Sequence, residues 1–322
     1  MSSTDEKAND PVSSRNTQPV ADSDSREGAL AEFAKAFLRR LPDEYTAAVS
    51  ESALWGQIES VFGFVSSRRA DEIAVRVFDP TEERDGYAAS GTVVDINVDD
   101  APFLVDSVSA AIERLGQEVV TEVHSVLGVV RSDDGGLVDL TPARGAERRE
   151  AIQHYQLKHH LSDAARGELA EALQGVLGDV HAAVADFVPM QGIVERMKEI
   201  ARFGEERYSF QRVADAEEFL DWLVDLNFIF LGYREYSISD QEGELFLSAV
   251  PDSGLGILRD TAGSKYATPV PLSELPEDLR GRYADGFLVV VSKTNRVSTV
   301  HRPARMDYIG VRHIGPDCSV IG

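Results

Sequence analysis

Four residues around one predicted strand-to-helix turn are suited to binding an anion or an amino acid. Asp99 and Asp100 follow a strand-like run, Phe103 stands just before a helical pattern, and Asp106 falls in its first turn. The first turn of a helix has backbone N–H groups without intrahelical partners, which an anion can use. Asp100 is also a good N-cap and Pro102 suits a first helical turn, so capping is the structural alternative. We treat Asp99, Asp100, Phe103 and Asp106 as a candidate effector turn.

A cluster of basic residues late in the sequence is the second candidate site. In a chain with a formal net charge of −23, such a cluster can hold a carboxylate, a phosphate or an acidic partner surface. The alternative is a solvated strand face or a domain interface with salt bridges to acidic neighbours. The candidate residues are Lys293, Arg296, His301, Arg302 and Arg305, with Arg312 and His313 close by in sequence.

Other kinds of chemistry find little support. His154 and His160 fall on one face of a predicted strand but lie roughly 20 Å apart at about 3.3 Å per residue, too far for one Zn²⁺. Gly254-Leu-Gly256 lacks the third glycine of a dinucleotide-binding loop, because Arg259 stands in its place. The sequence has no GxxxxGK[ST], HExxH or GxSxG motif. We therefore predict no catalytic, cofactor-binding or metal site in this chain.

Hydrophobic periodicity indicates the elements that position the candidate turn. Apolar residues at helical spacing predict amphipathic helices, and alternating runs rich in β-branched residues predict strands. Gly116 is expected to end the helix that follows the turn, and Asp133–Gly136 to form a turn of its own. The predicted helices cover 30–41, 54–65, 104–115 and 169–184, and the predicted strands cover 73–78, 92–98, 119–131 and 152–161.

A second unit is expected to begin near Ala214. Its pattern predicts a helix over 219–226, an aromatic-rich strand over 228–238 and a strand over 245–250, followed by a Pro-rich loop over 251–280. Two further strands, 287–292 and 297–301, are expected to form a hairpin around Lys293–Arg296, with a last strand over 306–314. Because the sequence stops soon after that strand, at Gly322, we expect the second domain to be incomplete.

Composition restricts the class of protein. The 322 residues, of which 43% are hydrophobic, are enough for about two domains with sizeable cores. The acidic balance, with a pI near 4.6, argues against non-specific binding to nucleic acid or to an anionic membrane. One cysteine, Cys318, fits a reducing compartment. Without a run of about 18 apolar residues or an apolar N-terminal signal, the expected location is the cytoplasm.

The expected fold class is α+β, in four parts. Residues 1–27 have almost no large apolar side chains and are predicted to be a disordered tail. An N-terminal domain with flanking helices covers 28–187, and a helical connector that includes a helix over 190–200 covers 188–212. A second α/β domain covers 213–322.

The stretch from Thr92 to Arg131 resembles the opening of an ACT domain, a small βαββαβ ligand-sensing sandwich. The resemblance is carried by a strand, Asp100-Ala-Pro102, an amphipathic helix, Leu115-Gly116 and a second strand. The typical ACT turn carries glycine where this sequence has Phe103, and that glycine lets an amino acid approach the backbone. Phe103 therefore argues against amino-acid binding at this turn.

Four blocks of sequence, in order, resemble the large bacterial NAD-specific glutamate dehydrogenases. The first is Val98-Asp-Asp-Ala-Pro-Phe-Leu-Val-Asp-Ser-Val108; the others cover 219–236, 254–259 and 298–309. The resemblance implies the N-terminal region of such an enzyme, with an ACT-like module followed by a PAS-like α/β module. The catalytic core and its NAD site then lie further along the parent chain, and no catalytic residue is carried over to these positions.

The function implied by this resemblance is regulation or assembly of an enzyme that converts L-glutamate, NAD⁺ and water to 2-oxoglutarate, ammonia and NADH. The implied partners are the rest of that enzyme chain, other copies in a homo-oligomer and an amino-acid effector. Two alternatives stay open: a free-standing amino-acid-sensing module of the ACT type, and a purely structural oligomerisation segment.

Overall fold

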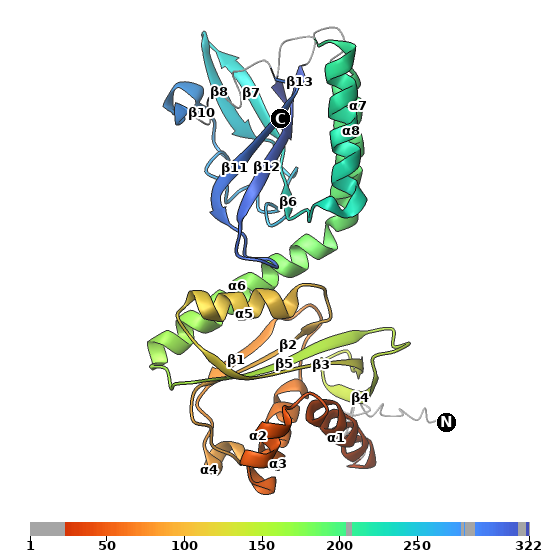
Figure 1. The fold of residues 1–322 in the computed structure, drawn as a ribbon, viewed down its shortest axis with the longest axis vertical. Coiled ribbons are helices and arrows are strands. Elements are labelled where there is room, and N and C mark those ends of the chain that lie inside the picture. Colours follow the sequence, from red (N-terminus) through yellow and green to blue (C-terminus); the bar gives the residue numbers. More distant parts are fainter. Residues whose placement is uncertain (1–22, 204–207, 278–279, 281–286, 315–319, 322) are drawn as a thin grey trace, which may run out of the picture.

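The computed structural model describes residues 23–203, 208–277, 280, 287–314 and 320–321. These residues form two modules joined through two consecutive long helices, α6 and α7 (Figure 1). The predicted α+β class is confirmed. The first module consists of α1 Ser23–Leu38, α2 Asp43–Ala48, α3 Glu51–Val65, β1 Ala74–Phe78, α4 Glu82–Asp85, β2 Val93–Asp99, α5 Leu104–Arg114, β3 Val119–Arg131, β4 Leu137–Pro142, β5 Arg149–Leu157 and α6 Asp163–Ala185.

The sheet of the first module has the strand order β1-β2-β5-β3-β4, with antiparallel neighbours throughout. β2 and β3 are parallel to each other with α5 as their crossover, and β5 lies between them, which is the split βαβ arrangement of the predicted fold. In a βαββαβ chain the last strand follows the second helix and pairs with the first strand. Here β1, which precedes β2, takes that edge position, so the ACT-like sheet is completed from the N-terminal side.

Helices cover both faces of this sheet (Figure 1). On one face, α5 and α6 pack on Val94, Ile96 and Val98 of β2. On the other, α1 and α3 pack on β3, β4 and β5. Alternate residues of β2 point to opposite faces, so Asp95 and Asn97 lie on the α3 side. Both are fully buried, although the alternating sequence pattern is typical of a strand with one solvated face.

Short-range signals explain where several helices begin and end. Ser50 and Ser162 each accept a hydrogen bond from the backbone three residues on, as N-caps of α3 and α6. Gly116, at φ +73°, follows the end of α5 as predicted, because this left-handed conformation strains residues with a side chain.

The second module places α7 and α8 side by side, against strands β11 and β12 (Figure 1). Its core on that side includes Val194, Leu220, Leu288 and Val311. The α/β class of this module agrees with the prediction, and its PAS-like character stays a prediction. Its elements are α7 Phe187–Phe203, α8 Phe210–Trp222, a π-helical turn Leu223–Asn227, β6 Gly232–Tyr233, β7 Tyr236–Gln241, β8 Glu244–Ala249, β9 Leu255–Gly256, β10 Val270–Pro271, a 3₁₀ turn Leu272–Glu274, β11 Val289–Val297, β12 Arg305–Val311, β13 His313–Ile314 and β14 Val320–Ile321.

The strands of the second module form three separate groups. A five-stranded sheet has the order β10-β8-β7-β14-β13, and β11-β12 and β6-β9 are two-stranded pairs. A separate small core, which includes Ile238, Leu247 and Tyr266, lies under the five-stranded sheet.

The hairpin predicted around Lys293–Arg296 is wrong. β11 runs continuously through these residues to Val297, pairs with β12, and shifts register between Lys293 and Val297. The connection between the strands is instead residues 298–304. A polar run at the exposed end of a two-stranded ribbon has the same composition as a turn, so local sequence does not separate the two.

Several other elements also differ from their predictions, including the following three. The strand predicted over 228–238 is broken between β6 and β7, where the Arg234 side chain donates to the backbone carbonyls of Leu258 and Asp260. The strand predicted over 152–161 ends at Leu157, and β4 was not predicted. The break in the first of these strands accompanies contacts with a distant segment, whereas β4 pairs with β3, its neighbour in sequence.

Two of the four predicted parts, the tail over 1–27 and the connector over 188–212, can be compared with the helices of the structure. Residues 1–22 of the predicted disordered tail lie outside the described residues, while 23–27 are helical in α1. The segment predicted as a connector contains α7 and the start of α8, whose apolar sides pack in the core of the second module.

Candidate functional site

The candidate effector turn has a backbone that favours glycine. Phe103 has φ +70° and ψ 1°, the left-handed conformation, and stands at the N-cap position of α5. Asp100 was expected to be that N-cap; it lies three residues earlier, and its carboxylate is 3.5 Å from the Arg149 guanidinium. The turn keeps the glycine-like backbone with a phenylalanine in it, which strains the residue and needs compensating contacts.

Those contacts come from the second module. The rings of Phe103 and His301 lie 5.0 Å apart between centroids, and His301 Nδ1 is 2.9 Å from Asp106 Oδ2. The His301 backbone N–H donates to Ser107 Oγ at 2.9 Å. The structure therefore brings two residues of the candidate turn together with one residue of the basic cluster. We call this contact region the module junction, and it consists of Phe103, Asp106, Ser107, Val300 and His301.

Burial, more than charge, stabilises the module junction. Val300 is 3% exposed and packs in the core formed by α5, α6 and the sheet. Full burial of a valine contributes about 1.5–3 kcal/mol. The Asp106 side chain is 59% exposed, so its pair with His301 contributes under about 1 kcal/mol. The chain's own residues thus cover the start of α5, where an effector was expected.

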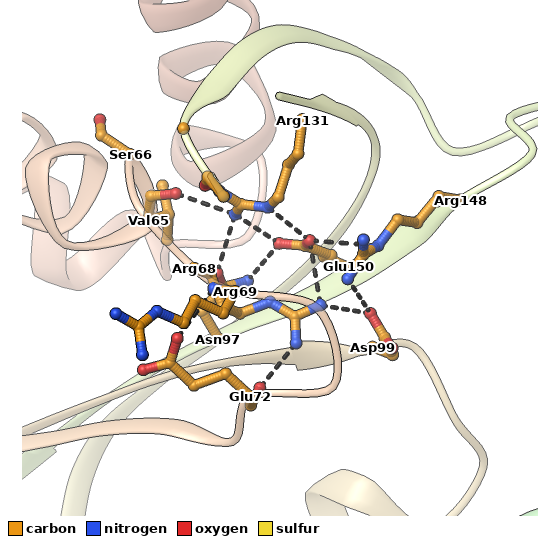
Figure 2. Close-up of polar contacts among 12 residues, drawn as sticks. Val65, Ser66, Arg68, Arg69, Glu72, Asn97, Asp99, Arg131, Arg148 and Glu150 are labelled. Atoms are coloured by element: carbon orange, nitrogen blue, oxygen red, sulfur yellow. Dashed lines mark hydrogen bonds and ion pairs between the residues drawn. The ribbon is translucent and has the colours of Figure 1, made fainter. Parts of the chain in front are cut away.

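The Asp99 carboxylate faces the arginine cluster, which consists of Arg68, Arg131 and Arg148 (Figure 2). Its carboxylate pairs with Arg68 and, at 3.1 Å, with Arg148. Arg68 also donates to Glu150 at 3.0 Å, and Arg131 grips Glu150 with two bonds of 2.7 Å. Asn97 donates to the same carboxylate at 2.9 Å.

Glu150 is the centre of this arginine cluster. Its side chain is 1% exposed, and the side chains of Arg68 and Arg131 are 1% and 4% exposed. Burial alone raises the pKa of a carboxyl group, but the hydrogen bonds and charges of Arg131 and Arg68 outweigh it and hold the pKa of Glu150 at about 2. The cluster joins the segment after α3 to β2, β3 and β5, and we interpret it as structural.

A second buried polar group lies beside the arginine cluster, on the same face of the sheet. Gln57 Nε2 is 2.7 Å from His154 Nε2, and His154 Nδ1 is 2.7 Å from Asp95 Oδ1. Because the Gln57 amide donates to Nε2, the proton of a neutral ring sits on Nδ1, facing Asp95. Burial raises the pKa of Asp95, but the hydrogen bonds and charges of His154 and Arg76 outweigh this effect, so the pKa is lowered overall. A His–Asp pair can orient a general base, but here the second ring nitrogen, Nε2, already accepts a hydrogen bond from the Gln57 amide.

The structure places His154 and His160 in different surroundings. His154 is fully buried, whereas His160 lies beyond the end of β5, 3.1 Å from Asp79. Among the described residues, no group of three or more His, Cys, Asp or Glu side chains is placed to hold a metal ion. Nor does any helix in the described part of the chain combine the length and apolarity needed to cross a membrane.

The glycines at 254 and 256 serve a tight turn. Gly256 has φ +58°, and its N–H donates at 2.6 Å to Asp186, the residue between α6 and α7. Arg259 pairs with the same carboxylate at 2.8 Å. A Cβ at position 254 would meet the Leu258 carbonyl oxygen at 2.2 Å. These contacts explain the motif without a dinucleotide.

The rest of the predicted basic cluster is spread over the second module. Lys293 pairs with Asp307 at 2.7 Å. Arg296 is exposed on β11, while Arg302 and Arg305 line a cavity beside α7. His301 is the member of the cluster that contacts Phe103, Asp106 and Ser107 of the first module. Arg68, Arg131, Glu150 and Asp186 were not predicted as site residues. Their ionic partners lie 19 to 82 residues away along the chain, so local sequence carries no signal for these contacts.

Comparison with known proteins confirms the resemblance that the four blocks indicated. Residues 33–173 match the family described as glutamate dehydrogenase, ACT1 domain. The chain is 30% identical to an NAD-specific glutamate dehydrogenase of Halomonas elongata over 299 residues, 90% of this chain and 18% of that protein. It is 30% identical to the enzyme of Pseudomonas aeruginosa over 249 residues, 76% of this chain and 15% of that protein.

A third relative is the NAD-specific glutamate dehydrogenase of Mycobacterium tuberculosis, which is 29% identical over 202 residues, 62% of this chain and 12% of that protein. The chain therefore spans less than a fifth of the length of the curated relatives it matches.

Proposed function

We propose, with the similarity to NAD-specific glutamate dehydrogenases as the premise, that this chain is a regulatory and assembly segment of such an enzyme. The parent enzyme would oxidise L-glutamate with NAD⁺ and water to 2-oxoglutarate, ammonia and NADH, and NAD would bind outside these 322 residues. The chain supplies no catalytic residue. Its partners are the rest of the enzyme chain and other copies of it, in the cytoplasm.

The module junction is the observation that supports this function best. An ACT-like turn that is closed by Val300 and His301 of the following module transmits the position of one module to the other. Packed side chains and hydrogen bonds shared by two modules can carry coupling between them, whereas an open turn would suit an effector. The junction therefore favours assembly and coupling over amino-acid binding at Phe103.

The first experiment tests the absence of catalysis. The purified chain is incubated with glutamate and NAD⁺, and NADH formation is followed by absorbance. We expect none above the blank, with the Pseudomonas aeruginosa enzyme as positive control. Glutamate-dependent NADH formation by the chain alone would sink the proposed division of labour.

The second experiment separates the alternatives. Calorimetric titration with a panel of amino acids, including aspartate and glutamate, tests the amino-acid-sensing module, and light scattering tests self-association. We expect no saturable heat at the covered turn and a mass above that of one chain. A binding isotherm that is lost in the Asp106→Asn variant would instead favour a sensor, and a monomer at high concentration would count against the assembly role.

A further inference from the structure

A cavity of about 340 Å³ lies in the second module, next to the module junction. Its lining includes Met190, Val194 and Met197 of α7, together with Phe230. Small-molecule pockets have volumes of about 300–1,000 Å³ and are mostly apolar, with a few polar groups that fix the orientation of the ligand. The cavity therefore has the size and lining of a pocket for a compact apolar molecule.

One end of the cavity is cationic. Arg302 and Arg305 line it and are exposed, whereas Met190 and Val194 are buried, so the charged end is the solvent end. Among the described residues, no ion pair or side-chain hydrogen bond engages either guanidinium group. Asp307 also lines the cavity, but Lys293 neutralises it at 2.7 Å. Two free guanidinium groups in a chain of net charge −23 suit an anionic group of a ligand.

We propose that this cavity binds a small apolar carboxylate, with its hydrocarbon part against α7 and Phe230 and its carboxylate at Arg302 and Arg305. Methionine side chains suit such a ligand because they adapt to irregular apolar shapes. An amino acid fits less well, since its ammonium group would lie beside the two arginines.

The cavity also gives its ligand a route to the first module. Val300 and His301 line the cavity and at the same time form the module junction. A ligand that orders the segment 298–305 would therefore favour the docked arrangement of the two modules. This effect needs no contact with the candidate turn itself.

The test uses octanoate as probe and 1-octanol and octylamine as matched probes without the carboxylate. Trp222 reports on the site because it contacts Phe228, which lines the cavity. The centroids of the two rings lie 5.5 Å apart. The chain contains two tryptophans, so a Trp55→Phe background leaves Trp222 alone. Binding is measured by its fluorescence and by calorimetry, with octanoate below its micellar concentration.

We expect saturable one-to-one binding of octanoate, at least tenfold tighter than that of either matched probe. The Arg302→Gln/Arg305→Gln variant should reduce this preference to within threefold, while Arg296→Gln, an exposed arginine outside the cavity, should leave it unchanged. Met197→Trp, which fills the cavity, should abolish binding.

Three results would overturn the proposal. Equal binding of octanoate and octanol would remove the role of the arginines, and no binding of any probe would remove the site. Octanoate binding that survives Met197→Trp, in a variant with an unchanged circular dichroism spectrum, would place it elsewhere. If Met197→Trp does not fold, the arginine variants and the Trp222 signal decide alone.

Discussion

The arginine cluster predicts that Glu150→Gln strongly destabilises the first module. The glutamine keeps the shape of the side chain but leaves two arginines, 1% and 4% exposed, without their anion. Removing one partner of a buried ion pair typically costs about 3–5 kcal/mol. We expect a loss of that order in the free energy of unfolding at pH 7.

The pH dependence of this loss has a definite sign. The pKa of Glu150 falls from 4.5 in the unfolded chain to about 2 in the folded protein. A lowered pKa stabilises the fold above the unfolded value, and the contribution of about 3 kcal/mol is lost as the pH falls from about 5 towards 2. By pH 3 about 2 kcal/mol of it is gone. The gap between wild type and Glu150→Gln should therefore narrow by about 2 kcal/mol between pH 7 and pH 3.

Urea unfolding measures this gap. Trp55 lies in α3 and Trp222 in α8, so a Trp222→Phe background reports on the first module alone. The matched control is Glu118→Gln, because Glu118 pairs with Lys158 at the surface and its loss should cost under about 1 kcal/mol. A gap below about 1 kcal/mol at pH 7, or one that is equal at pH 7 and pH 3, would refute the reasoning.

Two further predictions concern close backbone contacts. Gly56→Ala should destabilise the first module by about 1–3 kcal/mol, because its Cβ would meet the Gly86 carbonyl oxygen at 2.2 Å. Gly63→Ala in the same helix has open space and should stabilise the module by about 0.5–1 kcal/mol. Thermal unfolding of both variants measures these changes, and equal shifts in Tm would contradict the clash at Gly56. Asp186→Ala should speed amide hydrogen exchange in the segment around Gly256, by about tenfold for each 1.4 kcal/mol by which the free energy of local opening falls. Exchange in β5 should stay unchanged and is the internal control. No change at Gly256 would mean that the Asp186 carboxylate does not stabilise β9.

Much of the first module could be predicted from local pattern. The strands predicted over 92–98 and 119–131 correspond to β2 and β3. The apolar stripe over 104–115 corresponds to α5, and Gly116 at its end has φ +73°. These signals are local, because side-chain period and backbone preference act within a few residues. The resemblance to the glutamate dehydrogenases also rests on contiguous blocks, and so it could be recognised without a fold.

The candidate residues were found by type, but their partners were not. Asp99 and Asp106 were predicted to belong to one turn site, whereas in the structure Asp99 pairs with Arg68 and Asp106 contacts His301. The left-handed Phe103 departs from the glycine rule, and nothing near it in sequence indicates the ring of His301 that packs against it. Sequence spacing places side chains on a turn but leaves open which distant element covers each side of it.

By itself, the sequence determined the α+β class, most helices and strands, the acidic character and the family resemblance. Only the tertiary structure decided that β1 completes the ACT-like sheet, that Glu150 is buried between two arginines, and that Val300 and His301 close the candidate turn. The physical reason is that these contacts join residues far apart along the chain. Their energy comes from burial and charge pairing, which exist only once the modules have packed.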